Sequence, residues 1–587
     1  MSLDVARSIA VSSLMATQVQ ISVASANVAN ASTTGYTVKT AVQAATVSGG
    51  VGTGTTITAI TSNVDKLLLK SLVAATSEFS SASTSNDYLD QLQALYGSTT
   101  GTDSTGTSLA NTLASLETAI SSLSGTASSA ALQANTVSAL DNLAAQLRET
   151  SSGIQTLRSN ADTAISSAVD DVNTQLKAIA SLNAQIKLAT ASGQPTGDLE
   201  DQRNTALQAV AANMNVSYFI SSTGDMQVYT ASGQTLVDST VHELSFTAAA
   251  SVTASSTYNA TSTGLSGITV NGVDVTAQIT SGDIGALISL RDTVLPAAQA
   301  QLDQLATQLA SSLNAVSNTG TSVPPPATLT GTTTVTADTA LNATGTVRIA
   351  AADSSGNLVS YGDIDLSTVS TVGDLVTAIN GISGLSASID SSGHLVIASS
   401  SSSDGVSINE MSSAVGSPAV GLSDYLGLND LVTGTSASNI AVRSDILTNS
   451  GRLPVATLDS STTLTTGSSV LSAGSTTVVD ALYSALTGNT SFAATGGLGA
   501  STGSFADYAA NIISNVATKA ATAATTYTAK ETTLATFSSA MSSQSGVNLD
   551  EETAAISTLQ NQYTAASQLI QAINAMFSAL MTAVQST

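Results

Sequence analysis

Cysteine and tryptophan are absent from this chain of 587 residues, and histidine, aromatic residues and charge are scarce. Without cysteine there is no disulfide, no thiolate nucleophile and no thiolate-ligated metal. The two histidines, His242 and His394, lie far apart in the sequence, which favours a surface role for each over catalysis or metal binding. The sequence therefore offers little for enzymatic chemistry.

Charge is both rare and one-sided. Only 9% of the residues are charged, and the formal net charge is -25. An acidic surface repels phosphate backbones and anionic lipids, so neither nucleic acid nor a membrane is an expected partner. At the N-terminus, Asp4 and Arg7 interrupt the apolar pattern, so we expect no cleaved signal peptide and no apolar run long enough to span a bilayer.

Small and aliphatic residues dominate what is present, and their spacing predicts mostly helix. The first helix has two apolar stripes, one from Val5 to Ala26 at steps of three and four, and one formed by Leu14, Ile21 and Val28. A helix with two stripes needs neighbours on both sides, although an ordinary buried helix would show the same pattern. Because the C-terminal helix offers one seam, we expect the second N-terminal stripe to remain for contacts with other chains.

The central pattern predicts a helical rod. Helices are expected over 64–95, 109–123 and 284–316, and apolar steps of three and four from Leu140 to Ile186 predict a helix on the order of 80 Å long if it is continuous. Gly153 is expected to weaken it locally. Val, Thr and Gly between 40 and 61 suggest an irregular or β segment, and period-two alternation predicts a small antiparallel β unit at 216–238.

Pro324 to Pro326 mark the clearest boundary in the chain. A Thr/Ser/Gly-rich region with strand patterns follows, and helices dominate from Phe505 onward. We predict an α+β, discontinuous multidomain fold in which the N- and C-terminal helices form a coiled coil. The expected divisions are an N-terminal coiled-coil segment (1–60), a helical rod (61–327 and 436–545), an inserted β-rich outer domain (328–435) and a C-terminal coiled-coil segment (546–587).

Two terminal motifs carry a resemblance to a known family. "NVANASTTGYT", from Asn27 to Thr37, and "GVNLDEETAAISTLQNQYTAASQLIQAI" near the C-terminus resemble the ends of the axial proteins of the bacterial flagellum. Two internal stretches, "DLEDQRNTALQAVAANMNVSYFISSTGDMQVYTASGQTLVD" and "GDIGALISLRDTVLPAAQAQLDQLATQLASSLNAVSN", are similar to the hook-associated junction proteins of that group. One departure is Thr34, where the family commonly has a proline.

The resemblance implies a structural subunit that joins hook to filament and assembles through its terminal helices into a helical tube. The implied partners are other copies of the chain, the hook protein, a second junction protein and an export chaperone on the C-terminal helix, with no cofactor. It also implies an extracellular location, reached by flagellar export. The assembly interface is expected to comprise Leu14, Ile21, Asn27, Val28, Asn30, Gly35, Tyr36, Ile556, Leu559, Tyr563, Ile570, Ile573, Phe577 and Leu580.

Within that interface the motif residues have expected physical roles. Asn27 and Asn30 would satisfy backbone and cross-chain polar groups, Gly35 would leave the helix at positive φ, and Tyr36 would place its hydroxyl at a polar boundary. A plain helix end with a packed tyrosine remains compatible with the same residues. The low bulk of the terminal helices suggests that they are disordered before assembly.

Three other motifs are too weak to indicate a calcium, nucleotide or glycosylation site. Asp363 and Asp365 lack the spaced oxygen ligands of a calcium loop, "GGVGTGT" from Gly49 lacks the strand-then-helix context of a nucleotide site, and Asn215 and Asn259 begin weak glycosylation triplets. Three alternatives remain open at this point: the hook protein or another axial protein, a Ser/Thr-rich surface adhesin, and an enzyme grafted into the inserted domain.

Overall fold

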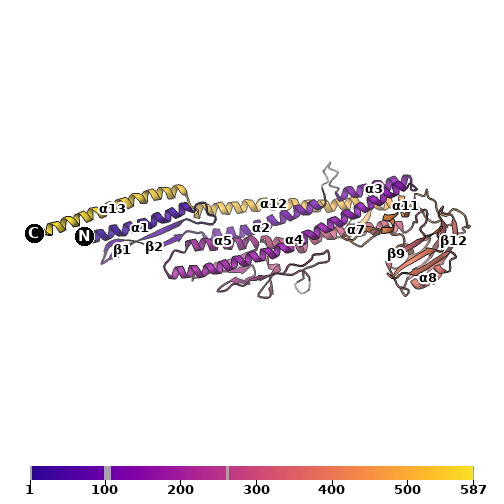
Figure 1. The fold of residues 1–587 in the computed structure, drawn as a ribbon, viewed down its shortest axis with the longest axis horizontal. Helices are drawn as coiled ribbons and strands as arrows, with labels where there is room; N and C mark the ends of the chain where they lie inside the picture. Colours follow the sequence, from indigo (N-terminus) through magenta and orange to yellow (C-terminus); the bar gives the residue numbers. More distant parts are fainter. Residues whose placement is uncertain (1–2, 98–107, 260–263, 586–587) are drawn as a thin grey trace.

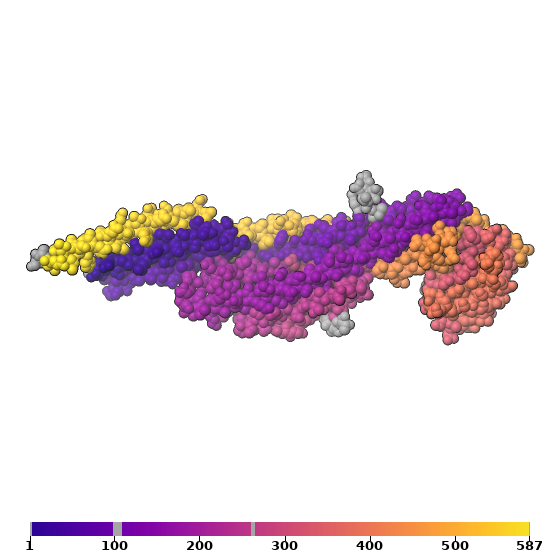
Figure 2. Space-filling model, viewed as in Figure 1, coloured from indigo at the N-terminus to yellow at the C-terminus, as the bar shows by residue number. Residues whose placement is uncertain are grey.

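The computed structural model describes residues 3–97, 108–259 and 264–585. Figure 1 shows an elongated molecule in which the two chain termini lie together at one end and a compact β-rich domain forms the other end. Long helices run between these ends, and in the space-filling view the terminal segment is a narrow arm (Figure 2). We call this arm, residues 3–62 and 549–585, the terminal arm.

The terminal arm contains two helices and one β-hairpin. They are α1 (Leu3–Ala29), α13 (Leu549–Gln585), β1 (Lys39–Ser48) and β2 (Val51–Ser62). The hairpin turns at Gly49 and Gly50, both at positive φ, which glycine adopts without strain. The glycine-rich stretch is therefore a hairpin turn between two strands, and the segment at 40–61 is regular β structure.

The rod consists of helices that run along one another (Figure 1). They are α2 (Lys66–Leu95), α3 (Leu109–Gly125), α4 (Ala130–Ala191), α5 (Gly197–Asn213), α6 (Gly282–Ser289), the π-helical turn η2 (Leu290–Val294), α7 (Leu295–Ser317), α11 (Thr477–Thr487) and α12 (Phe505–Ser545). The prediction of one long central helix is confirmed, because α4 is continuous over 62 residues, about 93 Å. Gly153 does not interrupt it; a Cβ there would lie 2.6 Å from the Leu95 side chain, so this glycine lets α2 approach closely.

Small β units decorate the rod. The predicted antiparallel unit is confirmed as β3 (Val216–Ile220), β4 (Met226–Thr230) and β5 (Thr235–Val237), with strand order β3-β4-β5. A second three-stranded unit and a hairpin are also present: β6 (Leu244–Ser245), β7 (Thr269–Val270), β8 (Val273–Asp274), followed by the short η1 (Thr276–Gln278), and β19 (Thr490–Phe492) with β20 (Ser501–Gly503).

The β-rich end is built on two three-stranded antiparallel sheets, with orders β12-β11-β15 and β13-β14-β9. The elements are β9 (Thr328–Thr334), β10 (Ala343–Thr344), β11 (Thr346–Asp353), β12 (Leu358–Asp365), η3 (Leu366–Thr368), α8 (Val372–Asn380), β13 (Leu385–Ile389), β14 (His394–Ser399), β15 (Asp404–Asn409), β16 (Ala414–Val415) and α9 (Leu422–Leu426). Their inward side chains share one core with α8.

The chain returns toward the rod through short elements. These are β17 (Val432–Thr433), β18 (Ala441–Val442), α10 (Ser444–Thr448) and η4 (Ser450–Arg452). Leu431 to Val455 contribute to the rod core, whereas Ala456, Leu458, Val470 and Leu471 pack against β11 and β12. Part of the segment expected to belong to the returning rod therefore covers the outer domain.

Two stretches, Leu3–Ala29 and Phe505–Gln585, are long and apolar enough by length and composition to cross a membrane. The prediction that no segment reaches this threshold is wrong, because abundant alanine raises the mean hydropathy without bulky side chains. In the structure α1 packs against α13 and the hairpin, and α12 packs against α2.

Candidate assembly interface

The N- and C-terminal helices pair as predicted. α13 packs along α1, and both chain ends lie at the tip of the arm, so the two helices are antiparallel (Figure 1). On α13, Ala566 and Ile573 are buried, and the half-buried residues at steps of three and four are Ile556, Leu559, Ile570 and Phe577. This is the seam that the sequence indicated, and it faces α1.

Two residues of the predicted seam are open to solvent. Tyr563 is 38% exposed and Leu580 is 54% exposed. α13 has 37 residues and α1 has 27, so α13 extends about 15 Å beyond its partner. Leu580 lies in that extension, where α1 no longer covers it.

The hairpin packs on one side of α1. Ser12, Gln20 and Asn27 bond to the hairpin: Thr55 N–H donates to Ser12 Oγ (3.2 Å), Gln20 Nε2 donates to Gln43 Oε1 (3.3 Å), and Asn27 binds Lys39. Leu14, Ile21 and Val28 lie on average roughly 130° further round the helix and are half-buried. α13 also packs along α1, so the helix has two neighbours within the chain.

That a stripe of α1 serves contacts with other chains stays a prediction, because Val19 of the first stripe is 37% exposed and Leu14, Ile21 and Val28 are only half-buried. The periodicity of the stripes indicates how many neighbours a helix needs. The hairpin supplies the second neighbour of α1, which the sequence pattern did not predict. A close approach of backbone and helix makes this possible, because a Cβ on Gly54 would lie 2.2 Å from Ser12 Oγ.

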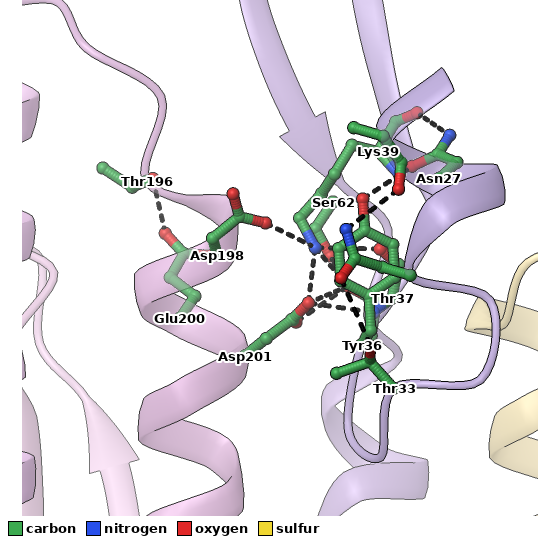
Figure 3. Close-up of polar contacts among 12 residues, drawn as sticks. Asn27, Thr33, Tyr36, Thr37, Lys39, Ser62, Thr196, Asp198, Glu200 and Asp201 are labelled. Atoms are coloured by element: carbon green, nitrogen blue, oxygen red, sulfur yellow. Dashed lines mark hydrogen bonds and ion pairs between the residues drawn. The ribbon is translucent and has the colours of Figure 1, made fainter. Parts of the chain in front are cut away.

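Asn27 closes the junction between α1 and β1 (Figure 3). Its Nδ2 donates to the Lys39 carbonyl (2.9 Å), and its Oδ1 accepts from the Lys39 N–H (3.0 Å) and from the Tyr36 hydroxyl (2.9 Å). The buried amide thus pairs with a strand residue as another strand would. The same geometry holds the hydroxyl of Tyr36, whose pKa burial raises to about 12 with help from nearby carboxylates.

Asn30 and Gly35 shape the turn that follows. Asn30 Nδ2 donates to the Ala26 carbonyl (3.0 Å) and its Oδ1 accepts from Thr33 (3.2 Å), so its contacts lie within its own turn. Gly35 has φ +79°, and an added Cβ would lie 2.4 Å from Thr205 Oγ1. The expected positive φ is confirmed, and the structure adds the close approach of α5.

A buried ion pair joins this turn to the rod. The Lys39 ammonium contacts the Asp201 carboxylate on α5, and both side chains are only 6% exposed. Lys39 Nζ also donates to the Thr37 carbonyl (2.8 Å) and lies 4.2 Å from the centre of the Tyr36 ring. Asp201 accepts from the Thr37 N–H (2.8 Å) and the Thr37 hydroxyl (2.8 Å), so the charge of each partner is fully engaged (Figure 3).

The C-terminal end of α12 contacts the residues beside the Lys39–Asp201 pair. Val38 N–H donates to the Ser545 carbonyl (2.8 Å), and Ser545 Oγ donates to the Asn63 carbonyl (2.9 Å). Four segments are therefore fixed together: the turn before β1, the end of β2, the N-terminal part of α5 and the end of α12. We call this contact set, centred on Lys39 and Asp201, the arm–rod clamp.

The clamp residues Thr37, Lys39, Asp201 and Ser545 were missing from the predicted interface. One signal was available, since Lys39 is the single charged residue between Ser8 and Val64. A lone charge in a neutral, packed segment requires a counter-charge. Its partner is 162 residues away, and no local pattern could identify it.

The arm is nearly free of charge yet exposes apolar side chains. Residues 553–587, 8–38 and 40–64 contain no Asp, Glu, Lys or Arg, in a chain of net charge -25. Large apolar side chains that are more than a third exposed occur on all its elements: Met15, Val19, Val42, Val47, Val51, Leu569, Met576, Leu580, Met581 and Val584. A surface of this kind marks a contact with another molecule.

The aspartates and histidines for which we predicted no metal or catalytic role make structural contacts. Asp363 binds the buried guanidinium of Arg348 with both oxygens (2.6 and 2.8 Å), and Asp365 accepts from the Ser367 N–H (3.0 Å). His242 lies beside Asp238 and Asn271, and His394 beside Asp390. Within residues 3–97, 108–259 and 264–585, no group of three or more His, Asp or Glu could hold a metal ion.

Four segments of this chain match models of known protein families. Residues 89–332 match the family model of the flagellar hook-associated protein FlgK helical domain, residues 8–37 match the flagella basal body rod protein, residues 538–583 match the flagellar basal body rod FlgEFG protein C-terminal model, and residues 328–401 match the flagellin hook IN motif. No curated protein matches the chain. The flagellar hook junction protein FlgK from Burkholderia pseudomallei matches in structure, with 17% identity, a TM-score of 0.49, and coverage of 80% of this chain and 99% of that chain.

Models of flagellar axial segments thus match both ends of the chain, its rod and its outer domain, which defines a structural protein of the bacterial flagellum. Over residues 89–332 the chain is similar to the flagellar hook-associated protein FlgK family. The adhesin interpretation is not favoured.

Proposed function

We propose that this protein is the junction adaptor between hook and filament, and that the terminal arm inserts among other arms to form the inner wall of a helical tube. The observation that carries the proposal is the charge-free arm with its exposed apolar flank on α13, at Leu569, Met576 and Leu580. These side chains lie beside the α1-facing seam, so they can be covered only by another chain.

The proposed partners follow from this surface. Copies of the chain, the hook protein and a second junction protein would contribute the neighbouring arms. An export chaperone would shield α13 before assembly, and export would proceed through the flagellar channel without a cleaved signal. Only Ala566 and Ile573 of α13 are buried in the single chain, which supports the proposal that assembly provides most of the stability of this helix.

A deletion strain and two double variants test the proposal. Loss of the protein should leave hooks without filaments, with filament protein shed into the medium. Leu569→Glu with Met576→Glu should leave the protein expressed and folded but unable to restore filaments, since burying two unpaired carboxylates in the assembled contact is unfavourable. The matched control, Tyr483→Glu with Leu447→Glu, alters apolar residues exposed outside the arm, at 39% and 49%, and should restore filaments. Normal filaments in the deletion strain would refute the junction role.

The proposal also predicts that the arm is labile before assembly. Hydrogen exchange on the monomer should show weak protection over residues 3–29 and 555–585 and strong protection in α4. Strong protection of both terminal helices in a proven monomer would contradict the idea that assembly orders them.

A further inference from the structure

One cation in the rod differs from every other cation that is at least partly buried. Lys519 on α12 is half-buried, and within the described ranges its ammonium makes no hydrogen bond and no ion pair. Lys39, Arg158, Arg203, Arg291 and Arg348 are all buried with carboxylate or carbonyl partners. A partly desolvated charge without a partner is unfavourable, so Lys519 would gain from pairing with a carboxylate of another molecule.

Lys519 lies in a groove between α2 and α12. The groove has a volume of about 710 Å³ and is lined mainly by small side chains, among them Ser81, Ala82, Ser85, Thr522 and Ala523. Small residues on two neighbouring helices leave a trough that a third helix can approach closely. Burial in it lowers the pKa of Lys519 below its ordinary value.

The chain also carries a complementary surface at the same level of the rod. On α4, an exposed row follows steps of three and four: Thr163, Ser167, Asp170 and Thr174. Asp170 and the adjacent Asp171 are exposed, and neither carboxylate has a partner in the described part of the chain. The row therefore presents short hydroxyl side chains and unpaired negative charge.

Contacts with helix α6 place the groove and the exposed row of α4 at the same position along the long axis of the rod. Val169 and Val172, on either side of the two aspartates, share a core with Ile284 and Leu287 of α6. Residues 280 and 281, directly before α6, line the groove. Thr84 on α2 donates to Asp283 of α6 (2.7 Å), which ties the groove to the same level.

α12 and α4 lie along opposite sides of the rod, with α2 between them (Figure 1), so the row of one molecule cannot reach its own groove. We propose that the groove of one copy receives the exposed row of α4 from a second copy, with Lys519 paired to Asp170. Because the two surfaces differ, the contact is heterologous and repeats from copy to copy, as a ring or helical array requires. The inference rests on the proposed self-association and names its rod contact.

Cysteine crosslinking tests this contact, since the natural chain contains no cysteine. The double variant Lys519→Cys, Asp170→Cys, assembled in cells and oxidised, should give a ladder of dimers, trimers and larger species. Each single variant should give no ladder, and a mixture of the two should give dimers only. The matched control pairs Lys519→Cys with Lys187→Cys and should not crosslink. Lys187 is exposed on α4, the helix that carries Asp170, and lies about 26 Å from Asp170 along it.

Charge exchange provides the second measurement. Lys519→Asp should lower competitive incorporation roughly five- to tenfold, because it places like charges together, and Asp170→Lys in the same chain should restore it. Lys187→Asp makes the same change in net charge and should have little effect. A double cysteine variant that incorporates without crosslinking, or a charge exchange that does not rescue, would overturn the contact. The junction role would still stand if the deletion strain lacks filaments.

Discussion

The arm–rod clamp predicts a specific loss of protection when its ion pair is broken. Asp201→Asn preserves the size of the side chain but removes the buried carboxylate that pairs with the Lys39 ammonium. Breaking a buried pair costs about 3–5 kcal/mol. Lys39 keeps the Thr37 carbonyl, the Tyr36 ring and the exposed Asp198 carboxylate, whose Oδ1 lies 3.6 Å from its Nζ. We therefore expect a cost of about 3 kcal/mol, at the lower end of this range.

The assay is hydrogen exchange at the amides that the clamp protects. Thr37 N–H bonds to Asp201, and Val38 N–H bonds to Ser545, so both report opening of the clamp. A loss of about 3 kcal/mol corresponds to exchange that is roughly a hundredfold faster at these sites. Amides in α4, distant from the clamp, should be unaffected.

Two further variants separate the ion pair from its surroundings. Lys39→Met with Asp201→Leu removes both charges and should recover most of the protection, because well-packed apolar residues often replace a buried pair without loss. Lys530→Gln breaks the exposed Lys530–Glu78 pair and should cost less than about 1 kcal/mol. If Asp201→Asn had no larger effect on opening than Lys530→Gln, the argument that the clamp fixes the arm to the rod would fail.

Three other expectations concern the arm. Gly35→Ala should destabilise the clamp by about 1–3 kcal/mol, through positive φ and the approach of Thr205, and exchange at Val38 would report it; an unchanged rate would contradict the strain argument. The raised pKa of Tyr36 means that the fold favours its neutral form, so the clamp's stability is complete below pH ~10, the pKa of a free tyrosine, and falls as pH rises toward about 12. Ultraviolet titration with Tyr36→Phe as control checks this, and the control should lack the loss. Ile573→Ala should weaken the α1–α13 pair by about 2–4 kcal/mol, seen as faster proteolysis of the arm; resistance equal to wild type would refute its place in the seam.

Local patterns identified the helices because the apolar spacing of an amphipathic helix repeats within a few helical turns. The three-four steps that predicted α4 also mark its buried side chains, from Leu140 to Ile186. The C-terminal seam through Ile573 faces its partner for the same reason. Period-two alternation likewise predicted the small β unit at β3 to β5, where short turns bring neighbouring strands together.

Pairings across long separations could not be read in this way. In the outer domain β14 pairs with both β13 and β9, and β9 begins more than sixty residues earlier. Strand propensity says only that each segment can pair, and many partners satisfy it. The position of 456–471 on the outer domain is a further case, because those residues carry no periodicity that distinguishes one core from another.

For the assembly surface, the sequence by itself determined that both ends are amphipathic helices, that the arm lacks charge, and that Gly35 leaves the helix at positive φ. Only the tertiary structure decided that the hairpin packs on one side of α1, that Lys39 pairs with Asp201, and that α13 keeps an exposed flank. The physical reason is that an apolar stripe or a lone charge is unfavourable in water or in a core without a partner, so local sequence indicates that a partner exists. Which residue is the partner depends on the distant segments that the whole fold brings into contact.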